Sequence, residues 1–304
     1  MAVVVSSNFA KLLYPGINKV YGQAYNEWKP EWPKLFDTYT SKRAFEEDVQ
    51  FTGLGLPSVK TEANSIVYDS FRQGFVERYV HVAYGLGFVI SREAVEDEQY
   101  GVLSSKKAKF LAFSMRQGKE VTLANIYNRA WDTNYTMADG LPLVSTAHLN
   151  YTGGTFSNAP TSDADVSEAA LEQACIDIGN TLNDRGLRIS LMPRSIHYAN
   201  GNQFEIKRIL GSSHRVGTSD NDISALYAMD EFPGGAHMNH YFTDSDAWFI
   251  RTNLPEDGMK MFQRRKPEFT ADNDFDTENA KYKATERYSG GCTDPRSIYA
   301  SQGA

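Results

Sequence analysis

Two histidines lie close enough in the sequence to suggest a metal site. His237 and His240 are three residues apart, and Asp244 and Asp246 could add oxygen ligands. Histidines at this spacing reach one metal ion together on a helix, whereas the adjacent Pro233-Gly234-Gly235 indicates a loop. A solvated loop is the preferred interpretation, and no metal site is predicted.

A second group of residues resembles a hydrolytic triad. Ser145 and His148 could act as nucleophile and base, with Asp139 orienting the base. A triad is defined by its geometry in space, so closeness in the sequence says little, and the sequence has no Gly-x-Ser-x-Gly turn. These side chains are better explained as hydrogen-bonding groups of a turn. A hydrolase that uses Ser145 and His148 is the less favoured alternative, and we predict that the chain is not an enzyme.

The sequence carries no nucleotide-binding motif and no disulfide framework. Gly85 and Gly87 lie within a strand pattern, where glycines mark bulges or close approach rather than a phosphate loop. Cys175 falls on the apolar stripe of a predicted helix, where a thiol behaves as a small hydrophobe. With Cys292 as the other cysteine, no bridge is predicted and a reducing compartment is expected. No cofactor is predicted.

Charge and hydropathy limit the partners of the chain. Its 304 residues carry a net charge of −7, and the densest basic run, Gln263-Arg-Arg-Lys266, is short. Tight binding to phosphate backbones needs more positive charge, although an acidic wall can enclose DNA without adhering to it. No segment has the length and apolar content of a membrane span, and the first residues do not form a signal peptide.

The most informative segment runs from Ala44 to Ile90. Residues 74–90 alternate apolar and polar side chains as a half-buried strand does, and Phe45, Val49 and Phe51 alternate with acidic and amide residues. A polar tip rich in Gly and Pro, residues 53–73, separates the two limbs. An isolated β-hairpin is marginal in water, and its open edges invite pairing with another chain. We therefore interpret 44–90 as an assembly device.

The other elements alternate in type and predict an α+β fold. The aromatic segment 9–36 is interpreted as an extended arm, with an N-terminal helix packed on its own domain as the alternative. Helices are predicted from Ser91 onward, over 103–131 as a long spine, over 166–182 with Asp165 or Ser167 as cap, and over 203–210; a loop or hairpin is predicted over 139–154; and strands are predicted over 187–198, 224–232, 247–252, 259–262 and 281–289.

Three groups of motifs together resemble the major capsid protein of tailed bacteriophages, in the branch similar to the Mu-like major head subunit. They extend from the hairpin to the end of the chain, so the resemblance covers nearly all of it. They are Phe51-Thr-Gly-Leu-Gly-Leu-Pro57 with Tyr84-Gly-Leu-Gly-Phe-Val-Ile-Ser-Arg-Glu93; Asp139-Gly-Leu-Pro-Leu-Val-Ser-Thr-Ala-His148 with Gly153-Gly154; and Asp244-Ser-Asp-Ala-Trp-Phe249, Phe275-Asp-Thr-Glu-Asn279, Lys281-Tyr-Lys283, Arg287-Tyr-Ser-Gly-Gly-Cys-Thr-Asp-Pro-Arg296 and Tyr299-Ala-Ser-Gln-Gly-Ala304.

The resemblance implies the HK97-like capsid fold, with an N-terminal arm, an extended loop, a peripheral domain with a long spine helix, and an axial domain. The segments of this chain correspond to these parts in order. They are the N-terminal arm, 1–43; the extended β-hairpin loop, 44–90; the peripheral domain with the spine helix, 91–164; the mainly axial domain, 165–265; and C-terminal strands that return to the peripheral domain, 266–304.

The resemblance also implies the function and the partners. Members of the family form homo-hexamers and homo-pentamers that close into an icosahedral head around double-stranded DNA, assembled in the host cytoplasm. A portal and, in some members, a decoration protein are further partners, and the packaged DNA is contacted weakly and without specificity. No long charged helical segment precedes the arm here, so a separate scaffolding protein is expected, with a sequence that is already the processed form as the alternative. An encapsulin-like nanocompartment shell of the same fold is the closest alternative.

Eight residues are the candidates for contacts between subunits. Aromatic, aliphatic and cationic side chains on the arm, the loop and the C-terminal segment suit such contacts. The candidates are Trp28, Trp32, Phe51, Leu54, Leu56, Lys60, Arg287 and Arg296. Lys60 at the loop tip could also suggest covalent crosslinking, but an exposed tip lysine is ordinarily a solubilising charge.

Overall fold

The computed structural model combines helices and strands, as the α+β prediction requires. It describes residues 10–91, 93, 100–214, 223–254, 257–274 and 279–303. The helix predicted to begin at Ser91 lies almost wholly outside the described residues, and so does most of the motif 275–279. None of the helices in the described residues combines the length and the hydropathy of a membrane-spanning segment.

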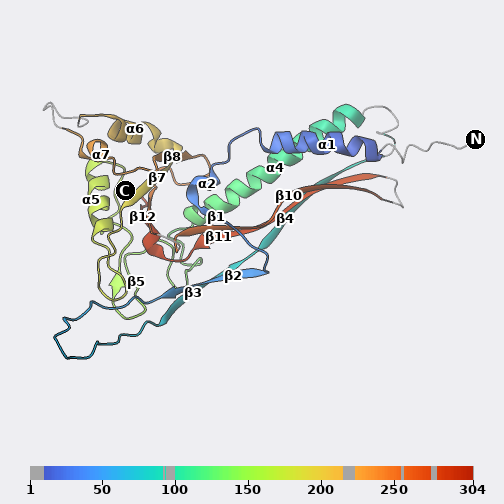
Figure 1. The fold of residues 1–304 in the computed structure, drawn as a ribbon. Coiled ribbons are helices and arrows are strands. Elements are labelled where there is room, and N and C mark those ends of the chain that lie inside the picture. The colour runs from blue at the N-terminus through green and yellow to red at the C-terminus, as the bar shows by residue number, and fades with distance from the viewer. Residues whose placement is uncertain are drawn as a thin grey trace, which may run out of the picture.

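The larger sheet, called the peripheral sheet below, forms the elongated part of the molecule (Figure 1). Its strands lie in the order β1, β10, β11, β4, with β1 parallel to β10 and the other pairs antiparallel. The strands are β1 (Asp37–Thr40), β10 (Met259–Asn273), β11 (Ala280–Cys292) and β4 (Val82–Ile90). The predicted strand 259–262 is thus the start of the much longer β10, and the predicted strand 281–289 covers most of β11. The two strands pair from Met259 with Cys292 to Asn273 with Ala280, with register shifts after Gln263 and Arg265.

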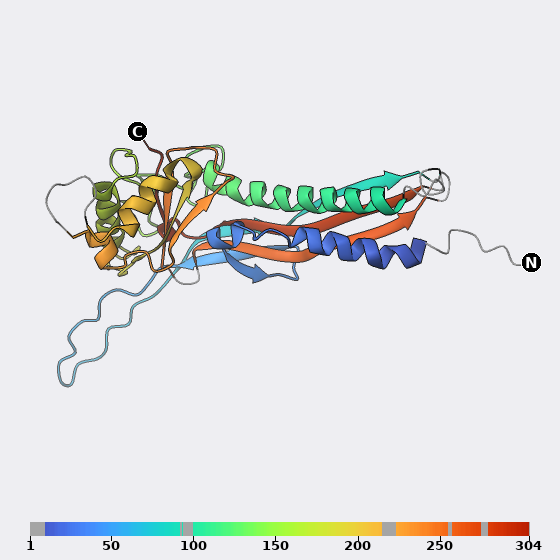
Figure 2. The ribbon, with the colours of Figure 1, turned by 90° about the horizontal axis from the view of Figure 1, so that it is seen from above.

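Two helices, α4 (Tyr100–Asn128) and α1 (Ala10–Tyr25), lie side by side over this sheet (Figures 1 and 2). The predicted spine helix is confirmed as α4, with both ends a few residues earlier than expected. Ile17 and Tyr21 of α1 pack with Leu111 and Met115 of α4 against Phe269 of the sheet. This apolar core fixes α1 on its own subunit.

The N-terminal segment is therefore not the extended arm that was predicted. Its described part forms α1, then α2 (Trp32–Leu35) and β1, all packed on the same chain, which is the alternative interpretation. The backbone N–H groups of Glu31 and Trp32 both donate to the Glu120 carboxylate of α4, each at 3.0 Å. Tyr21 and Trp32 of this aromatic segment thus contribute to the core of their own subunit.

The smaller sheet, called the axial sheet below, lies at the compact end of the molecule (Figure 1). Its strands have the order β12, β9, β7, β8, and helices pack beside them around Ile196, Trp248 and Ile250. The elements are β12 (Ile298–Ser301), β9 (Trp248–Thr252), β7 (Pro193–Ala199), β8 (Ala236–Asn239), α5 (Glu168–Gly179), α6 (Gln203–Gly211) and α7 (Ala225–Ala228). Short helical turns precede α6 (η2, Asn200–Asn202) and β12 (η3, Pro295–Ser297).

Local signals predicted some of these elements correctly. Ser167 caps α5, since its side chain accepts from the N–H of Ala170 at 3.2 Å. The predicted strand 224–232 is wrong, because this segment forms α7 with Leu226 buried in the axial core. The strand predicted over 187–198 begins at Pro193. Burial against a core can favour a helix where the local pattern alone favours a strand.

The sheets also correct the predicted limits of the C-terminal segments. Residues from Met259 belong to the peripheral sheet, so the axial part does not continue to 265. Conversely, β12 pairs with β9, so the last strand joins the axial sheet rather than the peripheral one. The chain therefore crosses between the two sheets once more than was predicted.

Candidate functional site: the extended hairpin and its root

A two-stranded hairpin leaves the body of the molecule next to the peripheral sheet. Strands β2 (Phe45–Phe51) and β3 (Gln73–Val80) pair antiparallel, and the long connection 52–72 projects away from the body (Figures 1 and 2). The predicted pairing of the two limbs is thus present at the base of the loop. The connection itself contains no strand.

The return limb is not the single strand that was predicted over 74–90. It divides at His81 into β3, which belongs to the hairpin, and β4, which pairs with β11 in the peripheral sheet. The buried imidazole of His81 is hydrogen-bonded to Ser289 Oγ at 2.8 Å and to Ser41 Oγ at 3.0 Å. These bonds fix the point where the chain changes partners, so the independent hairpin is shorter than 44–90.

The loop tip exposes apolar side chains rather than the polar surface that was predicted. Three of the candidate residues are largely exposed: Phe51 at 63%, Leu54 at 54% and Leu56 at 79%. The sequence interpretation missed further exposed apolar residues of the same loop, Val59, Ile66, Val67, Tyr68 and Phe71. Counting apolar residues across 53–73, instead of noting its Gly and Pro, would have found them. Lys60 lies among them and is exposed.

An ion pair joins the loop to the compact end of its own chain. Arg185 Nη2 lies 2.5 Å from Asp69 Oδ2, and the backbone N–H of Gly55 donates to the same oxygen at 2.8 Å. The hydrogen bond from Arg185, followed by those from the Gly55 and Ser70 backbone, lowers the pKa of Asp69 to about 2. Exposed pairs contribute little to stability, so this contact leaves the loop easy to displace.

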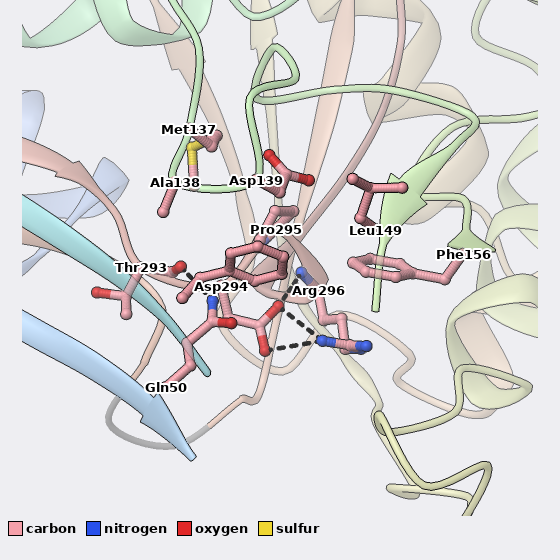
Figure 3. Close-up of a pocket in the computed structure, with 11 residues that line it drawn as sticks. Gln50, Met137, Ala138, Asp139, Leu149, Phe156, Thr293, Asp294, Pro295 and Arg296 are labelled. Atoms are coloured by element: carbon pink, nitrogen blue, oxygen red, sulfur yellow. Dashed lines mark hydrogen bonds and ion pairs between the residues drawn. The ribbon is translucent and has the colours of Figure 1, made fainter. Parts of the chain in front are cut away.

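The root of the hairpin is held by polar contacts to Thr293, just after β11, and to Lys260 of β10 (Figure 3 shows Thr293). Gln50 Nε2 donates to the carbonyl of Thr293 at 2.6 Å, and the hydroxyls of Tyr79 and Thr293 lie 2.6 Å apart. Lys260 of β10 pairs with Asp48 of β2 at 2.6 Å. The hairpin therefore has a well-fixed base and a tip that little holds in place.

Arg296 is not available for the contact between subunits that was predicted. It is 6% exposed, and its guanidinium donates to Asp184 at 3.0 Å and to Asp294 at 3.2 Å. It also donates to Asn150 and stacks over the ring of Phe156, 3.9 Å from the ring centroid (Figure 3). Its role is to join segments of one chain, because a buried cation needs its partners close by.

The remaining candidates divide between surface and interior. Trp28 is 64% exposed, so it remains available to another chain. Its ring centroid lies 6.0 Å from Arg116 Cζ. Trp32 is half-buried under Lys119, whose Nζ lies 4.6 Å from the ring centroid. Arg287 is half-buried, and its Nε donates to the carbonyl of His81 at 3.1 Å. The last two thus contribute mainly to the peripheral core.

The residues of the hydrolase alternative do not form a triad. His148 is buried, with Nδ1 2.6 Å from Asp139 Oδ2 and Nε2 3.3 Å from the carbonyl of Leu143. Ser145 instead accepts from the backbone N–H of Ala147. Although burial acts in the opposite direction, the hydrogen bond from His148 lowers the pKa of Asp139. The pair fastens a turn beside the hairpin root, as turn chemistry predicted.

The histidines first considered for a metal are likewise held by other contacts. His237 lies on β8 and contacts the carbonyl of Gly234 at 2.8 Å, while His240 Nδ1 lies 2.6 Å from Glu31. Across the part of the chain that the structure describes, no group of three or more potential ligands is placed to hold a metal ion.

Comparison with known proteins assigns this architecture. A family model described as phage capsid protein matches residues 76–301. A virus-like particle from Pyrococcus furiosus aligns with a TM-score of 0.53 at 11% identity, over 95% of this chain and 98% of that one. A chain of the procapsid of bacteriophage JBD30 aligns with a TM-score of 0.51 at 13% identity, over 98% of this chain and 76% of that one. A chain of Mycobacterium phage Patience aligns with a TM-score of 0.52 at 12% identity, over 95% of this chain and 86% of that one.

These similarities confirm the predicted HK97-like fold. At such identities the solved structures establish the fold alone, whereas the family model establishes the family. The Mu-like branch is not distinguished by them and stays a prediction. No curated protein matches the chain.

Proposed function

The chain belongs to the phage capsid protein family, and it is therefore a structural subunit of a virion shell. We propose that its copies associate through the extended hairpin into hexamers and pentamers. These rings would close the icosahedral head around double-stranded DNA. Assembly in the host cytoplasm belongs to the same proposal.

The observation that carries the proposal is the exposed apolar surface of the loop tip. Phe51, Leu56 and Tyr68 each expose most of their side chain, and little of the chain covers the loop. Removing apolar surface from water stabilises by roughly 25 cal/mol per Å². Monomers seldom present so many apolar side chains on one projecting segment, and such a surface usually marks a protein interface. A neighbouring copy is the cover that a shell supplies.

The spine helix and peripheral sheet of the adjacent copy are the proposed receiving surface. Phe110 and Phe113 of α4 are exposed, as are Val82, Leu86 and Val89 of β4, which lies at an edge of the sheet among the described strands. Loop and receiving surface are different parts of one chain, so the contact is heterologous. Small rotations at such a contact decide whether five or six copies close a ring.

The other partners are also proposed from the family. A separate scaffolding protein, a portal and a decoration protein would bind the shell, and DNA would be contacted weakly because the chain carries a net charge of −7. An encapsulin-like nanocompartment is the second candidate, since a virus-like particle has the same fold. The contents of purified particles, DNA or a protein cargo, separate the two.

Shortening the loop tests its role in assembly. Thr52 and Arg72 already face each other, the Thr52 N–H donating to the Arg72 carbonyl at 2.9 Å. Replacing residues 53–71 by Asn-Gly would therefore close the hairpin with a two-residue turn. The shortened chain should keep its far-ultraviolet circular dichroism and urea midpoint, yet form no shells by electron microscopy.

The matched control is Glu62→Gln, which removes one exposed charge at the same tip. It should assemble like the parent chain. Shells of normal size and yield from the shortened chain would refute the role of the loop.

A further inference from the structure

His81 is the residue at which the hairpin joins the peripheral sheet. It lies between Val80, the last residue of β3, and Val82, the first residue of β4, and it is only 3% exposed. One nitrogen of its ring contacts Ser41, which lies between β1 and β2, and the other contacts Ser289 of β11. A single imidazole therefore connects both ends of the hairpin to the sheet.

The hydrogen bonds around His81 assign its tautomer. The Ser41 hydroxyl donates its only hydrogen to Glu46 Oε1 at 2.6 Å, so its oxygen can only accept from its other neighbours. These are the Arg43 N–H at 3.1 Å and His81 Nε2 at 3.0 Å. Nε2 thus carries a hydrogen, and Nδ1 of the neutral ring accepts from the Ser289 hydroxyl at 2.8 Å. The uncharged imidazole satisfies all of these groups.

A second proton on the ring meets unfavourable surroundings. It would place a hydrogen on Nδ1, and the Ser289 hydroxyl would have to turn its own hydrogen away from the ring in order to accept. On the same strand, the Arg287 guanidinium donates to the His81 carbonyl at 3.1 Å, so one cation is already present. The carboxylate on the hairpin side, Glu46, is paired with Arg43 at 3.5 Å. A buried charge without a free partner is costly.

We propose that His81 is an acid-sensitive hinge of the extended hairpin. The neutral imidazole holds β2 and β3 against the peripheral sheet, and the imidazolium weakens the bonds to Ser41 and Ser289, so that the hairpin gains freedom to change its angle to the sheet. The hinge operates within one chain and does not depend on the proposed assembly.

The direction of the pH dependence follows from these surroundings. Burial, and then the charges of Arg287 and Arg264, lower the pKa of His81 from 6.5, although the charge of Glu46 acts in the opposite direction. A lowered pKa means that the released hairpin binds a proton which the docked hairpin excludes. Docking is therefore strongest well above pH 6.5, weakens as the pH falls through 6.5, and stops weakening only below the pKa of the docked ring.

Nuclear magnetic resonance of the unassembled full-length chain tests the state of the ring directly. The ring signals of His81 are assigned through the backbone and followed from pH 8 to pH 5. We expect the nitrogen shifts of the Nε2–H tautomer at pH 8 and a titration midpoint below 6.5. A midpoint at or above 6.5, or the Nδ1–H tautomer, would overturn the proposal.

Hydrogen exchange tests whether the ring controls the hairpin. The protection factors of the β2 and β3 amides are measured from pH 8 to pH 5 in the parent chain and in His81→Gln, whose amide is uncharged at every pH. Burial raises the pKa of Glu77 on β3 to about 7, so that group titrates in the same range. Dividing the parent values by those of His81→Gln removes its contribution. We expect this ratio to fall by at least about threefold between pH 8 and pH 5.

His240→Gln is the matched control. His240 lies in an exposed pair with Glu31, away from the hairpin, and its replacement should leave the pH dependence of β2 and β3 as in the parent. A ratio that stays constant from pH 8 to pH 5 contradicts the hinge, and so does a His240→Gln variant that loses the parent dependence. If His81→Gln does not fold, the ring titration of the parent chain decides alone.

Discussion

At the scale of single residues, the structure assigns Arg296 to the interior of the subunit. Its side chain connects the 182–184 segment, Asn150 and Asp294, and burial raises the pKa of Asp294 although Arg296 attracts its charge. The stability of this cluster thus depends on the positive charge of Arg296, which offsets the negative charges of Asp184 and Asp294.

Replacing Arg296 with Met should destabilise the unassembled chain by roughly 3–5 kcal/mol, because Asp184 and Asp294 lose the partner of their buried charges. Urea denaturation followed by tryptophan fluorescence measures the change. Arg185→Met provides the control, since its pair with Asp69 is exposed and screened by water, so its loss should change the stability far less. Equal losses in the two variants would show that burial does not govern the role of Arg296.

At the scale of elements, the close contact between the spine helix α4 and strand β11 requires a glycine in β11. A Cβ on Gly290 of β11 would lie 2.8 Å from Leu123 Cδ2 and 3.1 Å from Ile126 Cδ1, both on α4. The helix can therefore approach the sheet closely at this position. Gly118, on the exposed side of the same helix, has open space around it.

Gly290→Val should destabilise the unassembled chain by roughly 1–3 kcal/mol, because the added methyl groups force α4 away from β11. Gly118→Ala should do the opposite and stabilise it by about 1 kcal/mol, since alanine restricts the unfolded chain and favours the helix. Thermal denaturation of both variants by circular dichroism checks the pair. A neutral Gly290→Val variant would mean that the helix and the sheet are not closely packed there.

At the scale of the whole molecule, the subunit has a stable body and a projecting loop (Figure 2). Among the described residues, three apolar clusters hold the body together, whereas the loop is attached by a few polar contacts and one exposed ion pair. Such a division suits assembly, because the loop can adjust to different neighbours while the body stays unchanged. Individually modest contacts become strong when each copy makes several at once.

Leu56→Asp should therefore raise the protein concentration at which shells begin to form by more than about tenfold, because one lost contact recurs in every copy. Light scattering across a concentration series measures this threshold. Leu56→Met keeps an apolar side chain of similar size and should leave the threshold nearly unchanged. An unchanged threshold for Leu56→Asp would exclude this residue from the contacts between copies.

The sequence by itself determined the features that local physics encodes. The long run of helix-forming residues predicted α4, and alternation predicted strands at the hairpin root and in β4. Asp165 or Ser167 was the predicted cap of α5, and the structure has Ser167 there. The motifs spread along the chain predicted the correct family and fold. Each of these signals depends on neighbouring residues or on a set of short segments.

Only the tertiary structure decided which elements share a sheet and which side chains stay free. The split of the return limb at His81, the transfer of β12 to the axial sheet and the packing of α1 on α4 all depend on residues far apart in the chain. Arg296 and Leu56 are both plausible contacts by residue type, yet one is buried and the other exposed. Burial is a property of the whole packing, so local composition could not separate them.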